Sequence, residues 1–175
     1  MITPRSDFRQ AVGRVAARWW RGLDDDRGTR ASLRRAGCIT DVFGVPDFHH
    51  DLLRPLELLL NRQLTDSEAE WCAVVAAVLA HVEKSAPGST PAALGRYFGS
   101  SRKGTHARIS GLRFRRILAV EEPDSLMRTM IRVVRLMDKT CPIIALAAAL
   151  TGWPNEVTRR AIAMEYYAAA PTDEK

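Results

Sequence analysis

Apolar residues recur along this chain at the three- and four-residue spacing of an α-helix. The first to follow this spacing are Phe8, Val12, Val15 and Trp19. They predict a helix over about residues 5–21. The same spacing predicts a short helix ending near residue 36 and helices over about 48–61, 65–84, 90–97, 106–120, 124–139, 142–151 and 155–169. No segment alternates apolar and polar residues over more than a few positions, as a half-buried strand would. The pattern therefore predicts an all-α fold, a compact bundle of about seven or eight helices, with two small helical lobes as an alternative arrangement.

Local signals indicate where some of these helices begin and break. Thr65 is followed by Glu68, the S/T-x-x-E pattern in which each side chain hydrogen-bonds the backbone amide of the other residue at a helix start. Pro55 falls inside the helix predicted over 48–61, and we expect it to kink or split that helix because proline lacks the N–H group.

Composition is that of a globular protein, with 175 residues of which 46% are hydrophobic. We expect one helical domain over residues 1–170 and a frayed tail over 171–175. Its three cysteines form no CxxC pair, which favours reduced thiols over a disulfide framework or a zinc ribbon. The longest apolar runs are about ten residues, half of what a bilayer requires, and the first residues lack the apolar core of a signal peptide. We therefore expect a soluble, cytoplasmic protein.

Basic residues are concentrated in two blocks. Residues 1–35 hold nine basic against four acidic side chains, and residues 102–139 hold ten against four, whereas segment 36–101 holds four against eight. Blocks of one sign repel themselves and are typical of proteins that bind a polyanion. Only four of the 26 basic residues are lysine. Arginine is suited to phosphate because its planar guanidinium donates two parallel hydrogen bonds. Charge thus predicts nucleic-acid binding.

Within these blocks the basic residues recur at helical spacing. One row is Arg128, Arg132, Arg135 and Lys139, and a second is Arg27, Arg30 and Arg34. Like charges one turn apart destabilise a helix by a few tenths of a kcal/mol unless something neutralises them. Neither row includes an acidic residue. Two interpretations follow: contact with a nucleic-acid backbone, or salt bridges to the acidic segment 36–101.

The densest basic stretch runs over residues 108–118 and follows a glycine-flanked loop, residues 99–105. A basic loop that leads into a basic helix can clamp phosphates. The P-loop order G-x-x-x-x-G-K-[ST] is absent, so nothing supports nucleotide hydrolysis. The predicted nucleic-acid contacts are Arg27, Arg30, Arg34, Arg35, Arg102, Lys103, Arg108, Arg113, Arg116, Arg128, Arg132 and Arg135.

No combination of residues predicts catalysis. His49 and His50 are adjacent, but neighbouring histidines point in different directions on a helix, and no third metal ligand follows at a recognisable spacing. The aspartates at 24–26 are better explained by a solvated loop than by a magnesium site. No Ser/His/Asp or Cys/His signature is present. We therefore predict no enzymatic activity, no metal and no cofactor.

Several short motifs are similar to those of a known family. In order, they are residues 26–36, 45–49, 94–96, 108–110, 113–118, the helix 124–136, and the segment from Trp153 through Arg159 and Arg160 to Tyr166 and Tyr167. Together they resemble the CasB family, the small subunit of type I-E CRISPR Cascade complexes, over about residues 8–168. Their order, spacing and charge in combination are what make the resemblance specific.

The resemblance implies a non-catalytic, all-helical subunit, present as two copies in head-to-tail contact beside the backbone and large subunits of a crRNA-guided complex. Its basic faces would hold the R-loop by contacting the target DNA strand and the displaced non-target strand. R-loop formation is nearly balanced in base-pairing energy, so backbone contacts can tip it. Residue by residue, the resemblance points first to Arg27, Arg30, Arg34, Arg108 and Arg113.

Two other functions are compatible with a basic helical chain. A helix-turn-helix transcriptional regulator would be expected to carry Gln, Asn or Ser among the arginines of its recognition helix, whereas the basic helices here carry Phe114, Ile117 and Val133. A purely structural assembly protein would use its arginines to meet acidic protein partners. It would bind no nucleic acid, which distinguishes it from the other two.

Overall fold

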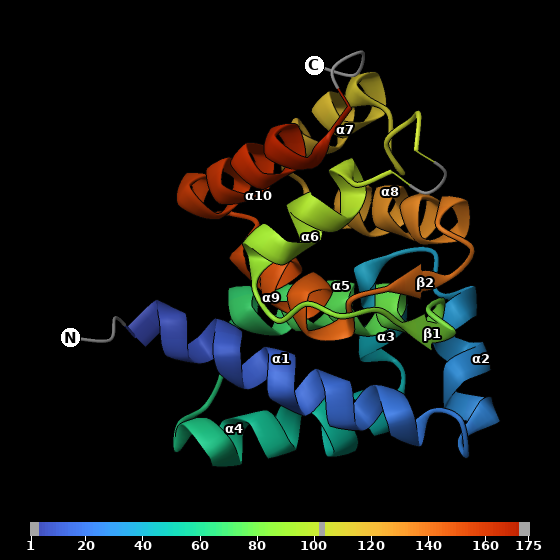
Figure 1. Ribbon diagram of the computed structural model, residues 1–175. Helices are drawn as coiled ribbons and strands as arrows, with labels where there is room; N and C mark the ends of the chain where they lie inside the picture. The colour runs from blue at the N-terminus through green and yellow to red at the C-terminus, as the bar shows by residue number, and fades with distance from the viewer. Residues whose placement is uncertain (1–3, 102–103, 172–175) are drawn as a thin grey trace.

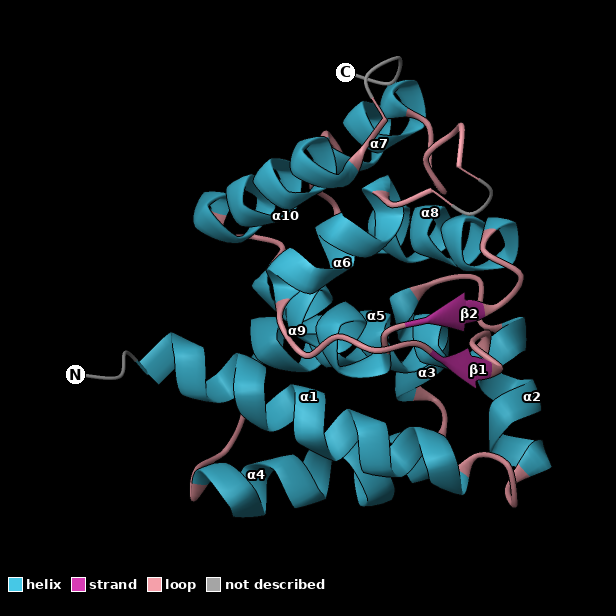
Figure 2. Ribbon diagram, viewed as in Figure 1, coloured by secondary structure: helices cyan, strands magenta, loops and turns pink. Residues whose placement is uncertain are grey.

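The computed structural model describes residues 4–101 and 104–171, and most of these residues are helical (Figures 1 and 2). The helices are α1 (Pro4–Gly22), α2 (Arg27–Arg35), α3 (Ile39–Phe43), α4 (Arg54–Leu60), α5 (Asp66–Ala80), α6 (Pro91–Gly99), α7 (Gly111–Leu118), α8 (Pro123–Leu136), α9 (Ile143–Gly152) and α10 (Glu156–Ala169). A π-helix, Phe48–Leu53, leads directly into α4. Two short strands, β1 (Lys84–Ser85) and β2 (Thr140–Cys141), pair in parallel. The all-α prediction is confirmed, with ten α-helices in the described part of the chain.

The structure corrects several predicted helix boundaries. The helix predicted over 65–84 ends at Ala80, because the chain then turns to pair β1 with β2. The helix predicted over 106–120 begins only at Gly111, since an antiparallel bridge between Ser101 and Ala107 holds the preceding segment in a loop. Helix α3 has five residues, too few to display a helical period, and the sequence pattern does not predict it.

Two helices lie at the centre of the molecule and are buried on nearly every side. Helix α5 buries every residue from Trp71 to Ala80, and α9 buries every residue from Ala145 to Gly152. A helix without a polar face has to lie inside a protein. The two pack against each other, and Figure 1 shows α1 and α4 on one side of this pair with α6 and α10 on the other. The predicted cap of α5 is confirmed, since Glu68 N donates to Thr65 Oγ1 at 3.2 Å and Thr65 N to Glu68 Oε2 at 3.0 Å.

Helices α6 and α10 approach each other unusually closely. A Cβ atom on Gly95 would lie 2.0 Å from the carbonyl oxygen of Ile162, and one on Gly99 would lie 2.3 Å from that of Tyr166. Both glycines are therefore needed for their lack of a side chain, because any Cβ there would overlap the backbone of α10. Tyr166 in turn donates a hydrogen bond from its hydroxyl to the carbonyl of Ile109 at 2.7 Å and stacks on Phe114. This packing fixes the start of α7 against α10.

None of the helices in the described part of the chain is long and apolar enough to cross a membrane. The expected tail, residues 171–175, lies outside the described residues except for Pro171. That residues 1–170 form a single domain stays a prediction.

Candidate nucleic-acid interface

The arginines of α8 point away from the core. Helix α8 buries Leu126, Met130 and Val133, whereas Arg128, Arg132 and Arg135 are exposed. At 100° per residue this row lies on the side of the helix opposite the apolar stripe. Arg132 and Arg135 form no hydrogen bond or salt bridge within the described residues. These guanidinium groups are thus available to an external anion.

The row on α2 is held differently. Asp26 caps the helix by accepting a hydrogen bond from Thr29 N at 3.0 Å, and Leu33 is fully buried. Arg30 lies beside Leu33 on the helix surface, so its side chain is only 14% exposed and pairs with Asp24 at 2.9 Å. Its Nε and Nη2 atoms are buried without a hydrogen-bond partner in the described part of the chain. Arg30 therefore faces inward.

Arg34 connects α2 to the end of α5. Its Nε donates to the carbonyl of Ala80 at 2.8 Å, one of the backbone acceptors that a helix C-terminus leaves unpaired. Its Nη2 lies 3.4 Å from Glu83 Oε1. Arg34 remains about one-third exposed, so part of its guanidinium still reaches the surface.

Arg27 and Arg35 are the outward-facing arginines of α2. Both are exposed. Within the described residues Arg27 has no ion pair, and Arg35 makes only a long hydrogen bond of 3.3 Å to Ser32. These two side chains point away from Leu33 because they lie on the opposite side of the helix.

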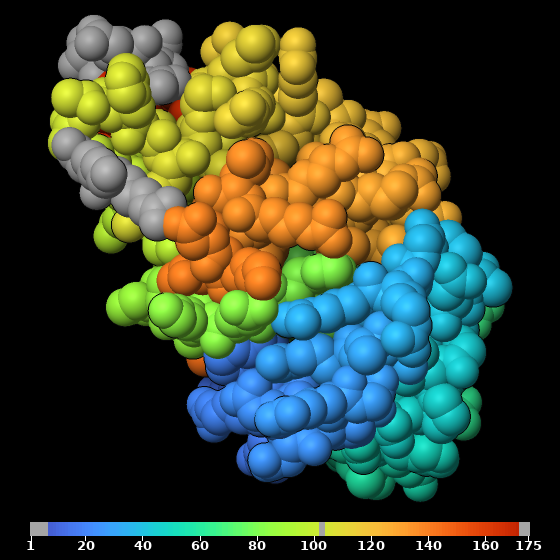
Figure 3. Space-filling model, turned by 90° about the vertical axis from the view of Figure 1, so that its right-hand side faces the viewer, coloured from blue at the N-terminus to red at the C-terminus, as the bar shows by residue number. Residues whose placement is uncertain are grey.

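Tertiary packing brings the α2 and α8 rows onto one side of the molecule. Arg128 reaches back to the carbonyl of Gly37, just after α2, at 3.4 Å. In the view of Figure 3, α2 in blue and the end of α8 in orange face the viewer together. We call this surface the basic face. We define it by the exposed or partly exposed basic side chains of α2, α8 and the turn after α8, which are Arg27, Arg34, Arg35, Arg128, Arg132, Arg135 and Lys139.

One carboxylate, Glu83, stands within the basic face. Asp138 and Lys139 adopt a left-handed backbone, with φ of 50° and 56°, which turns the chain out of α8. Lys139 Nζ then lies 2.7 Å from Glu83 Oε1, the same oxygen that Arg34 approaches. The hydrogen bond from Lys139 lowers the pKa of Glu83, with a further contribution from Arg34. Glu83 is therefore ionised at neutral pH and neutralises part of the basic face. The interpretation that the basic rows form salt bridges to the acidic segment 36–101 therefore holds for Arg34 and Lys139, which both pair with Glu83.

A buried histidine lies beneath the same region. His81 caps the end of α5 and is 7% exposed. Burial, together with the positive charges of Arg135, Arg34 and Lys139, lowers its pKa to about 4. His81 is thus neutral at pH 7, so the positive charge of the basic face comes from arginine and lysine alone.

The third basic cluster is divided between α7 and the preceding loop. Arg113 and Arg116 on α7 are exposed and make no ion pair within the described residues. Arg108, by contrast, is half-buried, donates from Nη1 to the carbonyl of Ser100 at 3.2 Å and to the Ser100 hydroxyl, and lies over the ring of Tyr97 at 4.5 Å. Arg102 and Lys103 lie outside the described residues.

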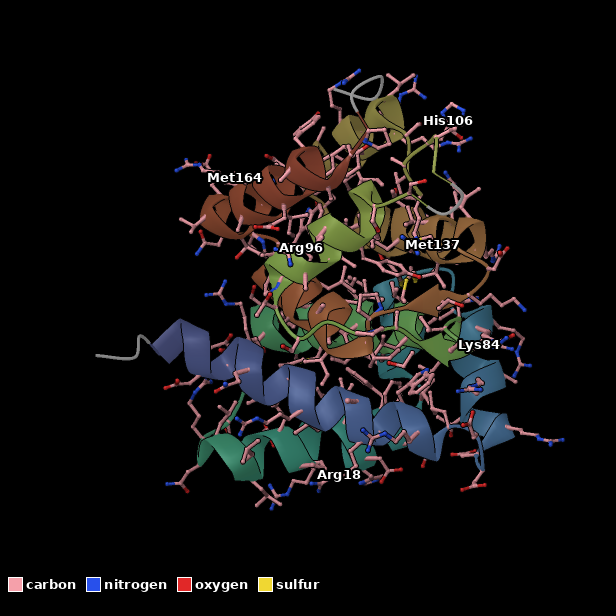
Figure 4. The ribbon with its side chains drawn as sticks, in the orientation of Figure 1. Arg18, Lys84, Arg96, His106, Met137 and Met164 are labelled. Atoms are coloured by element: carbon pink, nitrogen blue, oxygen red, sulfur yellow. The ribbon has the colours of Figure 1, made fainter. Side chains whose placement is uncertain are left out.

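A separate apolar groove of about 730 Å³ lies between α1 and α4. Its lining includes Trp19, Pro55, Leu58 and Leu59 together with Arg14 and Arg18, and Figure 4 labels Arg18. Leu58 is 67% exposed and Leu59 is 56% exposed. Exposed leucines that adjoin an apolar groove extend its apolar surface, and contiguous exposed apolar surface is typical of sites that meet another protein. Their exposure was not evident from the helical pattern.

Several of the residues considered for catalysis or metal binding make contacts within the fold. Asp24 pairs with Arg30 and Asp26 caps α2, so these two aspartates serve the fold. His49 Nε2 lies 2.8 Å from the carbonyl of Phe43. No group of three histidine, cysteine, aspartate or glutamate side chains close enough to share a metal occurs in residues 4–101 and 104–171. Burial raises the pKa of Cys72 and raises that of Cys141 to about 12, so both thiols are protonated.

Comparison with known proteins identifies a family. A family model described as CRISPR-associated protein Cse2 matches residues 29–167. The matched region includes most of α2, all of α8 and the loop that carries Arg108. No curated protein and no solved structure gives a significant match to the chain.

Proposed function

The chain belongs to the Cse2 family of CRISPR-associated proteins, and we propose that it stabilises the R-loop of a type I-E Cascade complex by binding DNA through its basic face. Membership of the family confirms the resemblance to the CasB small subunit and identifies the chain as a subunit of a CRISPR Cascade complex.

The observation that carries the DNA-binding proposal is the convergence of two arginine rows on one surface. The exposed arginines of α8 and of α2 come from distant parts of the sequence, yet the two helices lie on one side of the molecule (Figure 3), and Arg128 of α8 reaches the carbonyl of Gly37 just after α2. Guanidinium groups gathered on one face create a positive potential that attracts anions. A polynucleotide backbone supplies regularly spaced phosphates that match such a surface.

Contacts to the nucleic-acid backbone suit this task, because base pairing with the guide RNA reads the target sequence and the protein has to bind an R-loop of any sequence. The heteroduplex is about as stable as the DNA duplex that it replaces, so a modest gain from phosphate contacts shifts the balance. Phosphate contacts carry no direct sequence information. The subunit would therefore hold the target strand and the displaced strand of any sequence, in contact with the crRNA-bearing backbone and large subunits. We propose that it is non-catalytic and that it works in the cytoplasm.

The proposal also includes two copies in head-to-tail contact. Such a contact joins two different patches, one from each copy. Leu58 and Leu59 are adjacent exposed apolar side chains on α4, and Val157 and Met164 are exposed apolar side chains two turns apart on α10. We call these two pairs the apolar patches of α4 and α10. Figure 1 places α4 and α10 at opposite ends of the molecule. Two apolar patches at opposite ends support a head-to-tail arrangement better than a contact of one patch with itself.

The test is titration of the full chain with single-stranded and duplex DNA of unrelated sequences at several salt concentrations. With about five phosphates contacted on a single strand, log affinity should fall with log salt at a slope of roughly −3 to −4. Affinity should depend little on sequence. Strong preference for one duplex sequence would favour the transcriptional regulator, and no binding even at low salt would favour the structural assembly protein.

Three variants assign the binding to the basic face. Arg132→Gln removes one phosphate contact and should reduce the slope by about 0.7. Glu83→Gln removes the carboxylate that neutralises Arg34 and Lys139 and should strengthen binding roughly two- to fivefold, within the range for exposed ion pairs. Arg160→Gln on α10 removes an equal charge away from the basic face and should leave affinity nearly unchanged. Equal losses in Arg132→Gln and Arg160→Gln would contradict the assignment.

A further inference from the structure

A small pocket adjoins the basic face where α6, the loop before α7 and the end of α8 meet. It has a volume of about 200 Å³ and is lined by Tyr97, Arg108, Leu136, Met137 and Thr140. Arg135 and Lys139 of the basic face are the immediate sequence neighbours of Leu136 and Thr140. Figure 3 shows the yellow-green segment after α6 beside the orange end of α8, and Figure 4 labels Met137 at this end.

Two of the lining side chains are held in place by the fold. The Tyr97 hydroxyl donates to the carbonyl of Thr140 at 3.1 Å, which ties α6 to β2. The guanidinium of Arg108 lies 4.5 Å from the centre of the Tyr97 ring and is anchored through Nη1 to Ser100. A ligand that stacks on this pair would not have to order it first, which lowers the entropic cost of binding.

The guanidinium of Arg108 is only partly used. Its hydrogen bonds within the described residues all come from Nη1 and all go to Ser100. The Nε and Nη2 hydrogens are therefore available to a carbonyl oxygen or a ring nitrogen. Arginine offers a planar surface for stacking as well as donors at its edge.

The rest of the lining is apolar, which distinguishes this pocket from a phosphate site. Leu136 stands 49% exposed in a helix face otherwise lined by arginines, and Met137 beneath it is buried. Leucine and methionine side chains offer a phosphate neither a hydrogen-bond donor nor a positive charge. A flat, partly apolar ring with polar edges gains both stacking and hydrogen bonds.

We propose that this pocket takes one unpaired nucleobase of a single DNA strand whose phosphates lie on the basic face. Ligand pockets for drug-sized molecules span about 300–1,000 Å³, so a pocket of about 200 Å³ suits a single planar base. Every base has a π-face, so stacking adds affinity without selecting a sequence. The proposal rests on the proposed function, because the backbone has to be bound nearby. It adds that the subunit distinguishes an unpaired strand from a duplex, whose bases are already stacked.

The test compares oligothymidine with an abasic oligonucleotide of equal length and phosphate number. The full chain should bind oligothymidine roughly 5- to 150-fold more tightly than the abasic strand, the range expected for stacking one base. Leu136→Ala and Arg108→Lys should reduce this ratio towards one, the second because it keeps the charge but removes the planar surface. Leu112→Ala, which shortens an exposed leucine on α7, is the matched control and should keep the ratio.

A second readout locates the base directly. Oligonucleotides that carry 5-iodouracil should crosslink on irradiation to Tyr97 or to its neighbours in the pocket. Equal affinity for the two strands, or a ratio that Leu136→Ala and Arg108→Lys leave unchanged, would overturn the proposal that the pocket binds a base. It would leave the proposal that the basic face binds DNA intact. Binding to neither strand at low salt would instead overturn the proposed function, and the pocket with it.

Discussion

Arginine side chains that are equivalent in the sequence have very different surroundings in the fold. Arg132 points outward, Arg34 donates to the end of α5, and Arg30 is mostly buried against Asp24. Only an outward guanidinium can exchange water for phosphate without first losing an internal partner. We therefore expect Arg132 and Arg35 to contribute more to DNA binding than Arg30.

His81 makes the stability of the fold depend on pH. In the unfolded chain its pKa is near 6.5, whereas burial lowers it to about 4 in the folded protein. Between these values the unfolded state binds a proton that the folded state does not, so the free energy of unfolding falls as pH falls through this window. The loss from pH 7 to pH 5 should be about 2 kcal/mol, since one pKa unit corresponds to about 1.4 kcal/mol.

Urea unfolding at pH 7 and pH 5 measures this loss. The control is His81→Gln, which is uncharged at both pH values and should lose less stability over the same interval. Glu83 and Glu68, whose pKa values are lowered in the folded protein, contribute to further loss at lower pH in both proteins. An equal loss in wild type and His81→Gln would contradict the assignment to His81.

At the scale of elements, the contact between α6 and α10 depends on two glycines one turn apart. Gly95 and Gly99 face the backbone of α10 at Ile162 and Tyr166. This contact positions Phe114 through its stack on Tyr166, and with it the exposed arginines of α7. The geometry of the basic α7 helix is thus set by small residues in another helix.

Gly95→Ala should destabilise the protein. The new methyl group would lie 2.0 Å from the carbonyl oxygen of Ile162, so α6 and α10 would have to separate. Overpacking of this kind costs about 1–3 kcal/mol, which lowers the melting temperature by roughly 2–4 °C per kcal/mol in a protein of this size. Thermal unfolding followed by circular dichroism gives the shift. Gly22→Ala is the control, because no atom lies within 4 Å of its added Cβ, and it should melt no lower than wild type.

At the scale of the whole molecule, the basic face and the apolar patches of α4 and α10 lie on different helices. The basic face spans α2 and α8, whereas the exposed apolar patches lie on α4 and α10. A surface that binds a polyanion and a surface that binds protein can then be occupied at once. Variants in one should leave the other intact.

Leu58→Asp should weaken self-association without weakening DNA binding. The carboxylate would be buried in the proposed contact, where desolvation of an unpaired charge is costly. Sedimentation equilibrium of wild type, Leu58→Asp and Met164→Asp gives the association constants. In a head-to-tail contact each variant retains one intact patch, so an equimolar mixture should form mixed dimers. A mixture that stays monomeric, or a Met164→Asp variant that dimerises as wild type does, would contradict the head-to-tail arrangement.

The amino-acid sequence by itself determined the features that depend on neighbouring residues. Helical spacing predicted the fold class and most helices, because apolar residues at a period of 3.6 lie on one side of an α-helix and can be buried together there. The Thr65 cap followed from side chains three residues apart. The outward direction of Arg128, Arg132 and Arg135 followed from their place opposite the apolar stripe of α8. Collinear motifs identified the family, which the family match confirms.

Only the tertiary structure decided what depends on residues distant along the chain. The α2 and α8 rows meet because both helices pack on α5, and no local pattern encodes that meeting. Arg108 was predicted as a nucleic-acid contact from the family resemblance and from its place in the densest basic stretch, whereas its contacts with Tyr97 and Ser100 are set by the fold. Glu83 pairs with both Arg34 and Lys139. The number of acidic residues in segment 36–101 does not show which of them pairs with a basic residue. Periodicity specifies the direction of a side chain from its own helix, whereas the partner that it meets is set by the packing of the whole fold.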